Sequence, residues 1–307
     1  MTAKAKRLAR REHRRARRVP YVFIAPAIII LLVGMGYPVL WQLLTSAREF
    51  GLAQQFGKPA PFVWFQNYAD LLTDAQFWAV VIRSLAFMVF CAVLTLAIGL
   101  ALAVLMSTAH RFARIVLQVS LLLAWGMPVV ASMTVFTWLF DRRRGAVNYL
   151  FDKLPVVSLD RYDWLGHPIT FFMVAAVAVI WMSVPFVAFA IYAGLMQIPE
   201  EVLEAAALDG AGPAQRIRLI ALPMIRPVIA LVLLLQVIWD LRVFAQIRLL
   251  QGVGTNTGDF DLLGTYVYKL GTGSQDFGSA SAASVIILII TISISWFYVR
   301  IMIREEA

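Results

Sequence analysis

The amino-acid sequence predicts an all-α membrane protein with six transmembrane helices. Hydrophobic residues make up 61% of the 307-residue chain and charged residues only 15%, whereas soluble domains average roughly 45–50% apolar and about 25% charged residues. The mean hydropathy is +0.78. Apolar runs such as 91–100 show no alternation of apolar and polar residues, so they do not fit the short alternating strands of a membrane β-barrel. The spans are therefore expected to be helical.

Six apolar segments are long enough to cross a hydrocarbon core of about 30 Å, which requires roughly 20 residues of helix. They cover 20–44, 78–106, 114–140, 168–196, 226–250 and 280–303. Together with the connecting loops they predict one transmembrane domain over 20–303, preceded by a basic tail at 1–19 and followed by a short C-terminus at 304–307.

The basic tail fixes the expected orientation. Nine of the 27 lysines and arginines lie in the first 18 residues, and such a cluster before a span is normally retained in the cytoplasm. This placement also explains most of the net charge of +9 without a nucleic-acid partner. The apolar run that follows exceeds 20 residues, whereas the hydrophobic region of a cleaved signal peptide spans about 7–15. We therefore expect a retained first helix.

Six spans then place both termini in the cytoplasm, together with loops 107–113 and 197–225. These cytoplasmic parts hold 16 basic residues and the external loops hold eight, which agrees with the positive-inside rule. Three consecutive arginines, Arg142, Arg143 and Arg144, run against the rule locally, because they fall in an expected external loop.

Loop 197–225 is a polar insert between two strongly apolar spans. Pro199 fits a first helical position, and two glutamates follow it where they complement the helix dipole, so a short helix is expected to continue to about Leu208. Gly210 suits a left-handed cap, and Pro213 can open a second short helix. Pro223 and Pro227 are expected to end that helix before the fifth span.

Two interpretations of this insert remain open from its residues alone. The three alanines at 205–207 leave little side-chain bulk, and Gly210 permits close backbone approach, so the segment can sit tightly in a groove of a partner. Alternatively, it is an amphipathic helix that lies on the membrane surface without a partner.

Polar residues interrupt the fifth span at Gln236, Asp240, Arg242 and Gln246, at depths where such side chains normally face a bundle interior or a watery path. Asp240 lies about 21 Å beyond Arg226 at 1.5 Å per residue. These groups can hydrogen-bond sugar hydroxyls, and an aromatic residue of the fourth span can stack on a sugar ring. The candidate substrate path is Trp181, Gln236, Asp240, Arg242 and Gln246. The alternative is that they join helices or face a second subunit.

The sequence offers no catalytic residues and no metal site. The three histidines stand far apart, at 13, 110 and 167, without the spacing of metal ligands. Cys91 is the only cysteine and is expected to be a small buried hydrophobe. A Walker-like fragment, Gly51 to Lys58, has five residues between its glycines rather than four and lacks the following hydroxyl residue. We expect no cofactor on this chain.

The insert carries a specific resemblance. Glu204-Ala205-Ala206, then three residues, Gly210, nine residues and Ile220-Ala221-Leu222-Pro223 is similar to the cytoplasmic loop signature of permease subunits of binding-protein-dependent ATP-binding-cassette (ABC) importers. The resemblance implies a type I ABC importer permease fold with cytoplasmic coupling helices. It also implies that seven residues carry ATPase coupling: Glu204, Ala205, Ala206, Gly210, Ile220, Leu222 and Pro223.

The likeness extends to the maltose-type sugar permeases. Ile24-Ala25-Pro26 through Tyr37-Pro38, Trp64 to Tyr68, and Val184-Pro185-Phe186 with Ile198-Pro199 resemble the first span, the approach to the second and the fourth span of that group. The chain resembles the first of two paired permeases. It departs from the pattern at 250–255, where Leu-Gln-Gly-Val-Gly-Thr replaces the usual Leu-Thr-Gly-Gly-Gly-Pro.

This resemblance implies a multi-pass subunit of a bacterial or archaeal plasma (inner) membrane that imports a sugar, preferably a di- or oligosaccharide. The implied partners are the lipid bilayer, a second homologous permease, an extracytoplasmic solute-binding protein and two ATP-binding subunits that use ATP and magnesium. A glycerol phosphate or another sugar-like solute is the alternative cargo, since Arg242 can serve an anion. A secondary carrier would more often show internal inverted repeats, and the sequence shows none.

Overall fold

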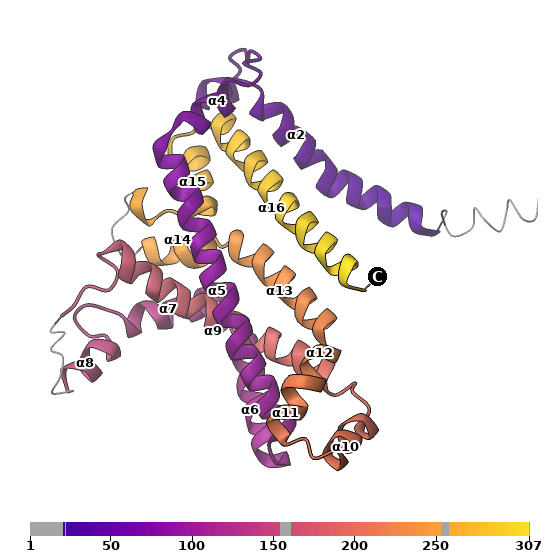
Figure 1. Cartoon of the computed structure of the whole chain (residues 1–307). Helices are drawn as coiled ribbons and strands as arrows, with labels where there is room; N and C mark the ends of the chain where they lie inside the picture. Colours follow the sequence, from indigo (N-terminus) through magenta and orange to yellow (C-terminus); the bar gives the residue numbers. More distant parts are fainter. Residues whose placement is uncertain (1–20, 22, 154–160, 253–257, 307) are drawn as a thin grey trace, which may run out of the picture. The chain divides into compact units, whose positions relative to one another are not determined.

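A computed structural model describes residue 21 and residues 23–153, 161–252 and 258–306 (Figure 1). Of the side chains near the C-terminus, those at 301 and 303–306 are not described. The basic tail lies outside the described residues. Regular structure in the described part is helical, apart from two isolated β-bridges, Arg48 with Phe62 and Gly51 with Asp276. The chain divides into unit 1, residues 1–71 and 270–285, and unit 2, residues 72–269 and 286–307.

Among the described residues, five helices are long and apolar enough to cross a membrane. They run over Phe23–Ser46, Ala75–Thr108, Pro168–Leu195, Arg226–Gln251 and Phe277–Arg300. The second and fourth expected spans correspond to single helices, α5 (Ala75–Thr108) and α9 (Pro168–Leu195). The sixth lies within α16 (Phe277–Glu306).

The third expected span, 114–140, is not one straight helix. It consists of α6 (Arg111–Trp125) and α7 (Val129–Leu139), which are bent by 98° at the intervening residues. The break contains Gly126 and Pro128. Proline lacks a backbone N–H and disfavours helical conformation in the residue before it, so the helix ends here although the run stays apolar. Counted as one span, the bent pair completes six.

The fifth span is also interrupted. It is formed by α13 (Arg226–Leu241) and α14 (Ala245–Gln251), and the residues between them, 242–244, are not helical. The sequence predicts one continuous span over 226–250, because Arg242 is the single polar residue at the break and apolar residues flank it on both sides.

Unit 1 contains a π-helical turn, η1 (Leu32–Gly36), followed by α2 (Tyr37–Ser46) and α3 (Leu52–Gln55). The next helix, α4 (Gln66–Thr73), begins in this unit and ends in unit 2. Within unit 1, the Asn67 side-chain amide donates to the carbonyl oxygens of Ser46 and Arg48, at 2.9 Å each. The Ser46 and Tyr68 hydroxyls lie 2.6 Å apart. These bonds join the end of α2 to the start of α4.

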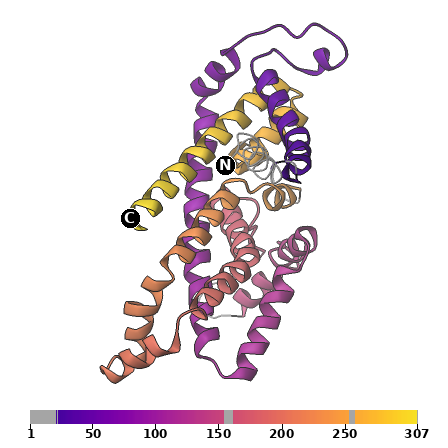
Figure 2. The same ribbon diagram turned by 90° about the vertical axis from the view of Figure 1, so that its right-hand side faces the viewer.

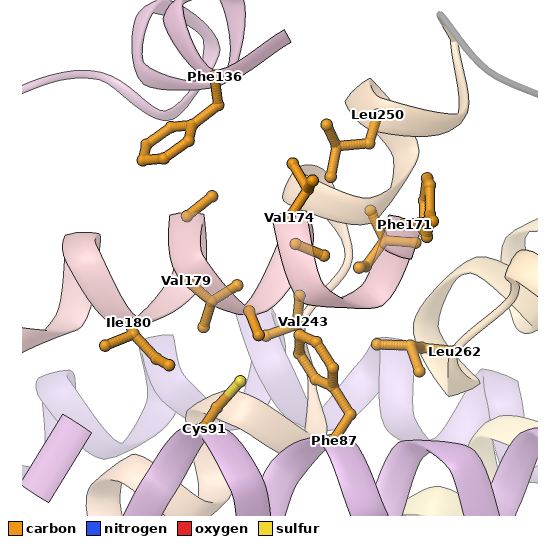
Figure 3. Close-up of a cluster of buried hydrophobic side chains, with 14 of the residues drawn as sticks. Phe87, Cys91, Phe136, Phe171, Val174, Val179, Ile180, Val243, Leu250 and Leu262 are labelled. Carbon is orange, nitrogen blue, oxygen red and sulfur yellow. The ribbon is translucent and has the colours of Figure 1, made fainter. Parts of the chain in front are cut away.

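Unit 2 is built on the pair α5 and α9. Figure 3 shows part of its main hydrophobic core, in which Phe87 and Cys91 of α5 lie against Val179 and Ile180 of α9. Leu250 of α14 belongs to the same cluster. The Cys91 side chain is fully buried, as expected for a small hydrophobe.

Short elements complete the described chain. They are α8 (Ala146–Asp152), α10 (Glu200–Leu208), α11 (Pro213–Arg216), the π-helical turn η2 (Ile217–Ala221), α12 (Leu222–Met224), η3 (Gly258–Phe260), α15 (Leu263–Tyr268) and the π-helical turn η4 (Lys269–Gly273).

The segment around η3 and α15 is tied to the first half of α5. Arg83 donates from one guanidinium nitrogen to the carbonyl oxygens of Gly258, at 3.1 Å, and Asp261, at 3.0 Å. The Tyr266 hydroxyl donates to the Asp74 carboxylate at 3.3 Å. Burial first, and the nearby Asp74 charge second, raise the pKa of Tyr266 to about 12. The phenol is therefore a neutral donor at physiological pH.

Candidate functional site

The short helix expected to run to about Leu208 is present as α10, and one of its faces packs against the rest of unit 2. Ala206 is buried, and Leu203 contacts a cluster that includes Ala103 of α5 and Ile191 of α9. Figures 1 and 2 both show α10 and α11 at the end of unit 2 where α5 meets α6. The three-residue spacing of Leu203 and Ala206 places them on one side of the helix, which fixes which side faces outward.

The outward face of α10 is polar and small, with one large apolar residue at its end. Glu204, Ala205 and Gly210 are exposed, and Leu208 is 90% exposed. Glu204 makes no ion pair or side-chain hydrogen bond within the described part of the chain. An apolar side chain that extends from a polar helix end gains stability only when another molecule covers it.

The turn after α10 is a Schellman motif, in which a left-handed residue lets two backbone amides bond back into the helix. The Ala211 amide donates to the Ala206 carbonyl at 2.9 Å, and the Gly210 amide to the Ala207 carbonyl at 3.1 Å. Gly210 has φ +86°, and a side chain at this position would meet no atom of this chain within 4 Å. The left-handed cap expected at Gly210 is therefore present. Glycine is favoured at this position because of its backbone conformation, and not because the chain leaves too little space for a side chain.

The two ends of the insert differ slightly from expectation. Pro199 is the cap residue before α10 rather than its first helical residue. The second helix opens at Pro213 as expected, but Pro223 does not end it, because this proline occupies an early position in α12. Pro227 likewise lies in the first turn of α13. Prolines are tolerated in a first helical turn, where the missing N–H has no partner to lose.

The last three residues predicted to carry coupling have different surroundings. Leu222 packs against the same hydrophobic cluster as Leu203, Ile220 is half-buried and Pro223 is exposed. Between them Ala221 is buried, at 4% exposure. This second part of the insert therefore packs on the same hydrophobic cluster as α10.

A cavity of about 450 Å³ opens where the fifth span is broken. Asp240, Arg242 and Gln246 line it, together with Ser183 and Phe186 of α9. The non-helical residues between α13 and α14 form part of its wall, as does Trp125 at the end of α6. Irregular backbone at membrane depth is tolerated where it is buried in protein or lines a cavity. Both helix breaks of unit 2 therefore meet this cavity.

Gln236 and Asp240 form a buried pair beside the cavity. The Gln236 side-chain amide donates to one Asp240 carboxylate oxygen at 2.9 Å, as their four-residue spacing on one helix face permits. Gln236 is 1% exposed and Asp240 is 3% exposed. The other Asp240 oxygen and the Gln236 carbonyl oxygen have no hydrogen-bond partner among the described residues. Arg242, by contrast, is exposed and forms no ion pair with Asp240 within that part.

Two of the five residues predicted for the substrate path are absent from the cavity lining. Trp181 packs edge-on against Phe136, with ring centroids 5.7 Å apart, and Gln236 reaches the cavity only through Asp240. The aromatic lining comes instead from Trp125, Phe244, Trp239 and Phe186, and the last two rings lie 5.0 Å apart. Sequence reasoning missed these four because they come from three different helices and from the break between α13 and α14.

No group of three or more metal-ligating side chains is found among the residues whose placement is described. Two candidate functional features stand out in the described chain: an exposed polar helix on one end of unit 2 and a polar-aromatic cavity between broken helices. Apolar helices of this number and length define a multi-pass membrane protein.

Comparison with known proteins identifies the class. Residues 95–304 match the family described as "Binding-protein-dependent transport system inner membrane component". The chain belongs to this family of inner-membrane permeases. It is 36% identical to a diacetylchitobiose uptake system permease protein of Streptomyces coelicolor, over 97% of this chain and 90% of that protein. It is 29% identical to a trehalose/maltose transport system permease protein of Thermococcus litoralis, over 94% of each.

A solved structure supports the fold. A chain from the crystal structure of a bacterial ABC transporter involved in import of the acidic polysaccharide alginate superposes with a TM-score of 0.83, at 24% identity, over 96% of this chain and 99% of that one. The all-helical ABC importer permease fold expected from the sequence is thus confirmed.

Proposed function

We propose that this protein is the transmembrane subunit of an ATP-driven importer and carries a sugar, preferably a di- or oligosaccharide. It forms the translocation path together with a second, homologous permease. An extracytoplasmic binding protein delivers the solute, and two ATP-binding subunits hydrolyse ATP with magnesium on the cytoplasmic side. Both termini lie in the cytoplasm in this arrangement, as the basic tail favours.

The observation that carries the proposal is the outward face of α10. Its inner residues are fixed by packing, its end is fixed by the Schellman turn, and Ala205, Leu208 and Gly210 remain uncovered. A rigid, low-bulk helix end suits a cleft in an ATPase subunit. Closure of two such subunits on ATP then moves α10, and its packing against the ends of α5 and α9 passes that movement to the spans.

The cavity supplies the solute site. Asp240 and Gln246 provide hydrogen-bond partners for hydroxyl groups, and Trp125 and Trp239 provide flat surfaces on which a sugar ring can stack. Named sugar permeases among the relatives support this cargo. The second candidate is an anionic solute such as a glycerol phosphate, and the exposed Arg242 at the cavity is the observation that favours it.

Coupling is tested by the substitution Gly210→Asp in the purified complex. Aspartate in the left-handed conformation is strained and adds a charge at the outward end of α10, so we expect the ATPase subunits to be lost on purification and uptake to stop. Gly212→Ala is the matched control, because Gly212 has φ −67° and tolerates a methyl group. Intact association and uptake in Gly210→Asp contradict the coupling assignment.

Transport is tested in proteoliposomes that contain the full complex. Uptake must depend on both ATP and the binding protein; uptake by this chain alone under an ion gradient indicates a secondary carrier instead. Competition between a neutral disaccharide and a glycerol phosphate distinguishes the two candidate cargos.

A further inference from the structure

A second polar hollow lies outside the coupling helix and the cavity. It has a volume of about 350 Å³ and is formed where α7 ends and α8 begins. Arg142, Arg143, Arg144 and Arg161 line it, with Asp152 as the acidic residue in the lining. The lining thus has an excess of three positive charges. We call it the arginine hollow.

The backbone under the arginine hollow is held rigidly. The Asp141 carboxylate accepts hydrogen bonds from the amides of Arg143, at 2.9 Å, and Arg144, at 2.7 Å. Gly145 closes the turn, because a Cβ there would lie 2.7 Å from the Leu139 carbonyl oxygen and even closer to that of Asp141.

The buried Asn148 holds the turn from the other side. Its amide nitrogen donates to the carbonyl oxygens of Arg142, at 3.2 Å, and Tyr162, at 3.0 Å, while its oxygen accepts from the Trp164 indole at 2.7 Å. A backbone fixed in this way loses little conformational entropy when a ligand binds.

The arginines of the hollow differ in whether their guanidinium groups already have partners in this chain. Arg142 is engaged, since it donates to the Arg161 carbonyl at 3.1 Å and lies 4.0 Å from the Asp163 carboxylate. The guanidinium groups of Arg143 and Arg144 are exposed and make no hydrogen bond or ion pair with the residues that the structure describes. Two adjacent free guanidinium groups on a rigid turn can each bind a carboxylate through paired N–H donors.

We propose that the arginine hollow docks an acidic segment of the extracytoplasmic binding protein, with aspartate or glutamate side chains seated between Arg143 and Arg144. This inference rests on the proposed function, which supplies the partner and places the loop between α7 and α9 outside the membrane. A protein partner fits better than a solute, because the exposed rings of Trp138 and Tyr149 flank the hollow and aromatic residues with arginine are typical of protein interfaces.

The first test measures local protection. The full chain in phosphatidylcholine nanodiscs is treated with phenylglyoxal, which modifies arginine, and the modified positions are read by mass spectrometry. We expect hexaglutamate to protect Arg143 and Arg144, uncharged hexaglutamine to leave them reactive, and salt to remove the protection. The position-by-position readout separates the hollow from the basic N-terminal tail. Equal modification with both peptides overturns the inference, and protection by phosphatidylglycerol nanodiscs without peptide assigns the hollow to lipid instead.

The second test measures docking in the reconstituted importer. We expect the double variant Arg143→Glu, Arg144→Glu to raise the binding-protein concentration for half-maximal uptake at least tenfold, with the maximal rate unchanged. Lys58→Glu, an exposed charge reversal on a separate external loop, should change neither. If the wild-type complex shows no uptake dependent on the binding protein, the proposed function fails. If it does, and the double variant saturates like the wild type, only the docking inference fails.

Discussion

Gly99 of α5 lies directly against Val187 of α9. A Cβ at position 99 would stand 2.9 Å from the Val187 Cβ and 3.2 Å from the Ala188 amide nitrogen, closer than packed side chains normally approach. The missing side chain allows the two long helices at the centre of unit 2 to touch. Small residues at helix crossings are the usual means of close packing in membranes.

We expect Gly99→Ala to lower the unfolding temperature of the detergent-solubilised protein, because overpacking in a tight core typically costs about 1–3 kcal/mol. Val187→Ala removes the opposing methyl groups, so the double variant should recover part of the loss. The control is Gly34→Ala, at a position where an added Cβ meets no atom within 4 Å. Additive effects of Gly99→Ala and Val187→Ala contradict a direct contact.

The outward and inward residues of α10 should separate coupling from stability. Leu208 is 90% exposed, so Leu208→Ala should leave the unfolding temperature unchanged while it weakens retention of the ATPase subunits severalfold on affinity purification. Leu203→Ala serves as the counterpart, because Leu203 packs against the hydrophobic cluster below and its loss should lower the unfolding temperature. Full ATPase retention in Leu208→Ala means that this residue is not covered by the partner.

The buried Asp240 should matter for uptake through its free carboxylate oxygen. Asp240→Asn keeps the shape and can keep a bond to Gln236, whereas Asp240→Ala leaves Gln236 with a buried amide that lacks its partner, which typically costs about 1–3 kcal/mol. We expect uptake to fall at least tenfold in Asp240→Ala and less in Asp240→Asn. Gln236→Ala should lower uptake as well. Normal uptake in both alanine variants removes this pair from the proposed substrate path.

The raised pKa of Tyr266 predicts that the protein becomes less stable at high pH. Its pKa in the folded protein is raised from 10.0 to about 12, so the unfolded chain releases this proton at a lower pH than the folded chain does. The stabilising contribution is complete below pH 10 and is lost as the pH rises toward about 12. Unfolding temperatures measured from pH 9 to 12 should fall more steeply for the wild type than for Tyr266→Phe. Parallel curves contradict this assignment.

Local features of the fold were predictable from the sequence because their causes are local. The cap at Gly210 and the start of α11 at Pro213 follow from backbone preferences of glycine and proline, and they are present at the expected residues. The apolar spans are likewise predictable, because they follow from the number of consecutive apolar residues. Pro128 and Gly126 carried a signal for the 98° bend, but the unbroken apolar run concealed it.

The cavity was only partly predictable. Asp240, Arg242 and Gln246 were identified as polar residues within a span, and all three line it. Trp125, Phe186 and Trp239 could not be identified, because their convergence depends on how three helices pack. Trp181 is predicted to line the substrate path as an aromatic residue one helix away, yet its ring packs against Phe136. A single sequence gives no direction for a side chain on a helix that is apolar on all sides.

The two helix breaks of unit 2 have a mechanical consequence. A cavity bounded by the sides of continuous helices changes size only if whole spans move through the lipid. This cavity is bounded on one side by the continuous helix α9 and on the others by helix ends, at Trp125 and between Arg242 and Phe244, where the helical hydrogen-bond ladder is already open. Rotation of α14 about the joint at 242–244 would move Ala245 and Gln246 and so change the size of the cavity, while the long helix α9 stays rigid.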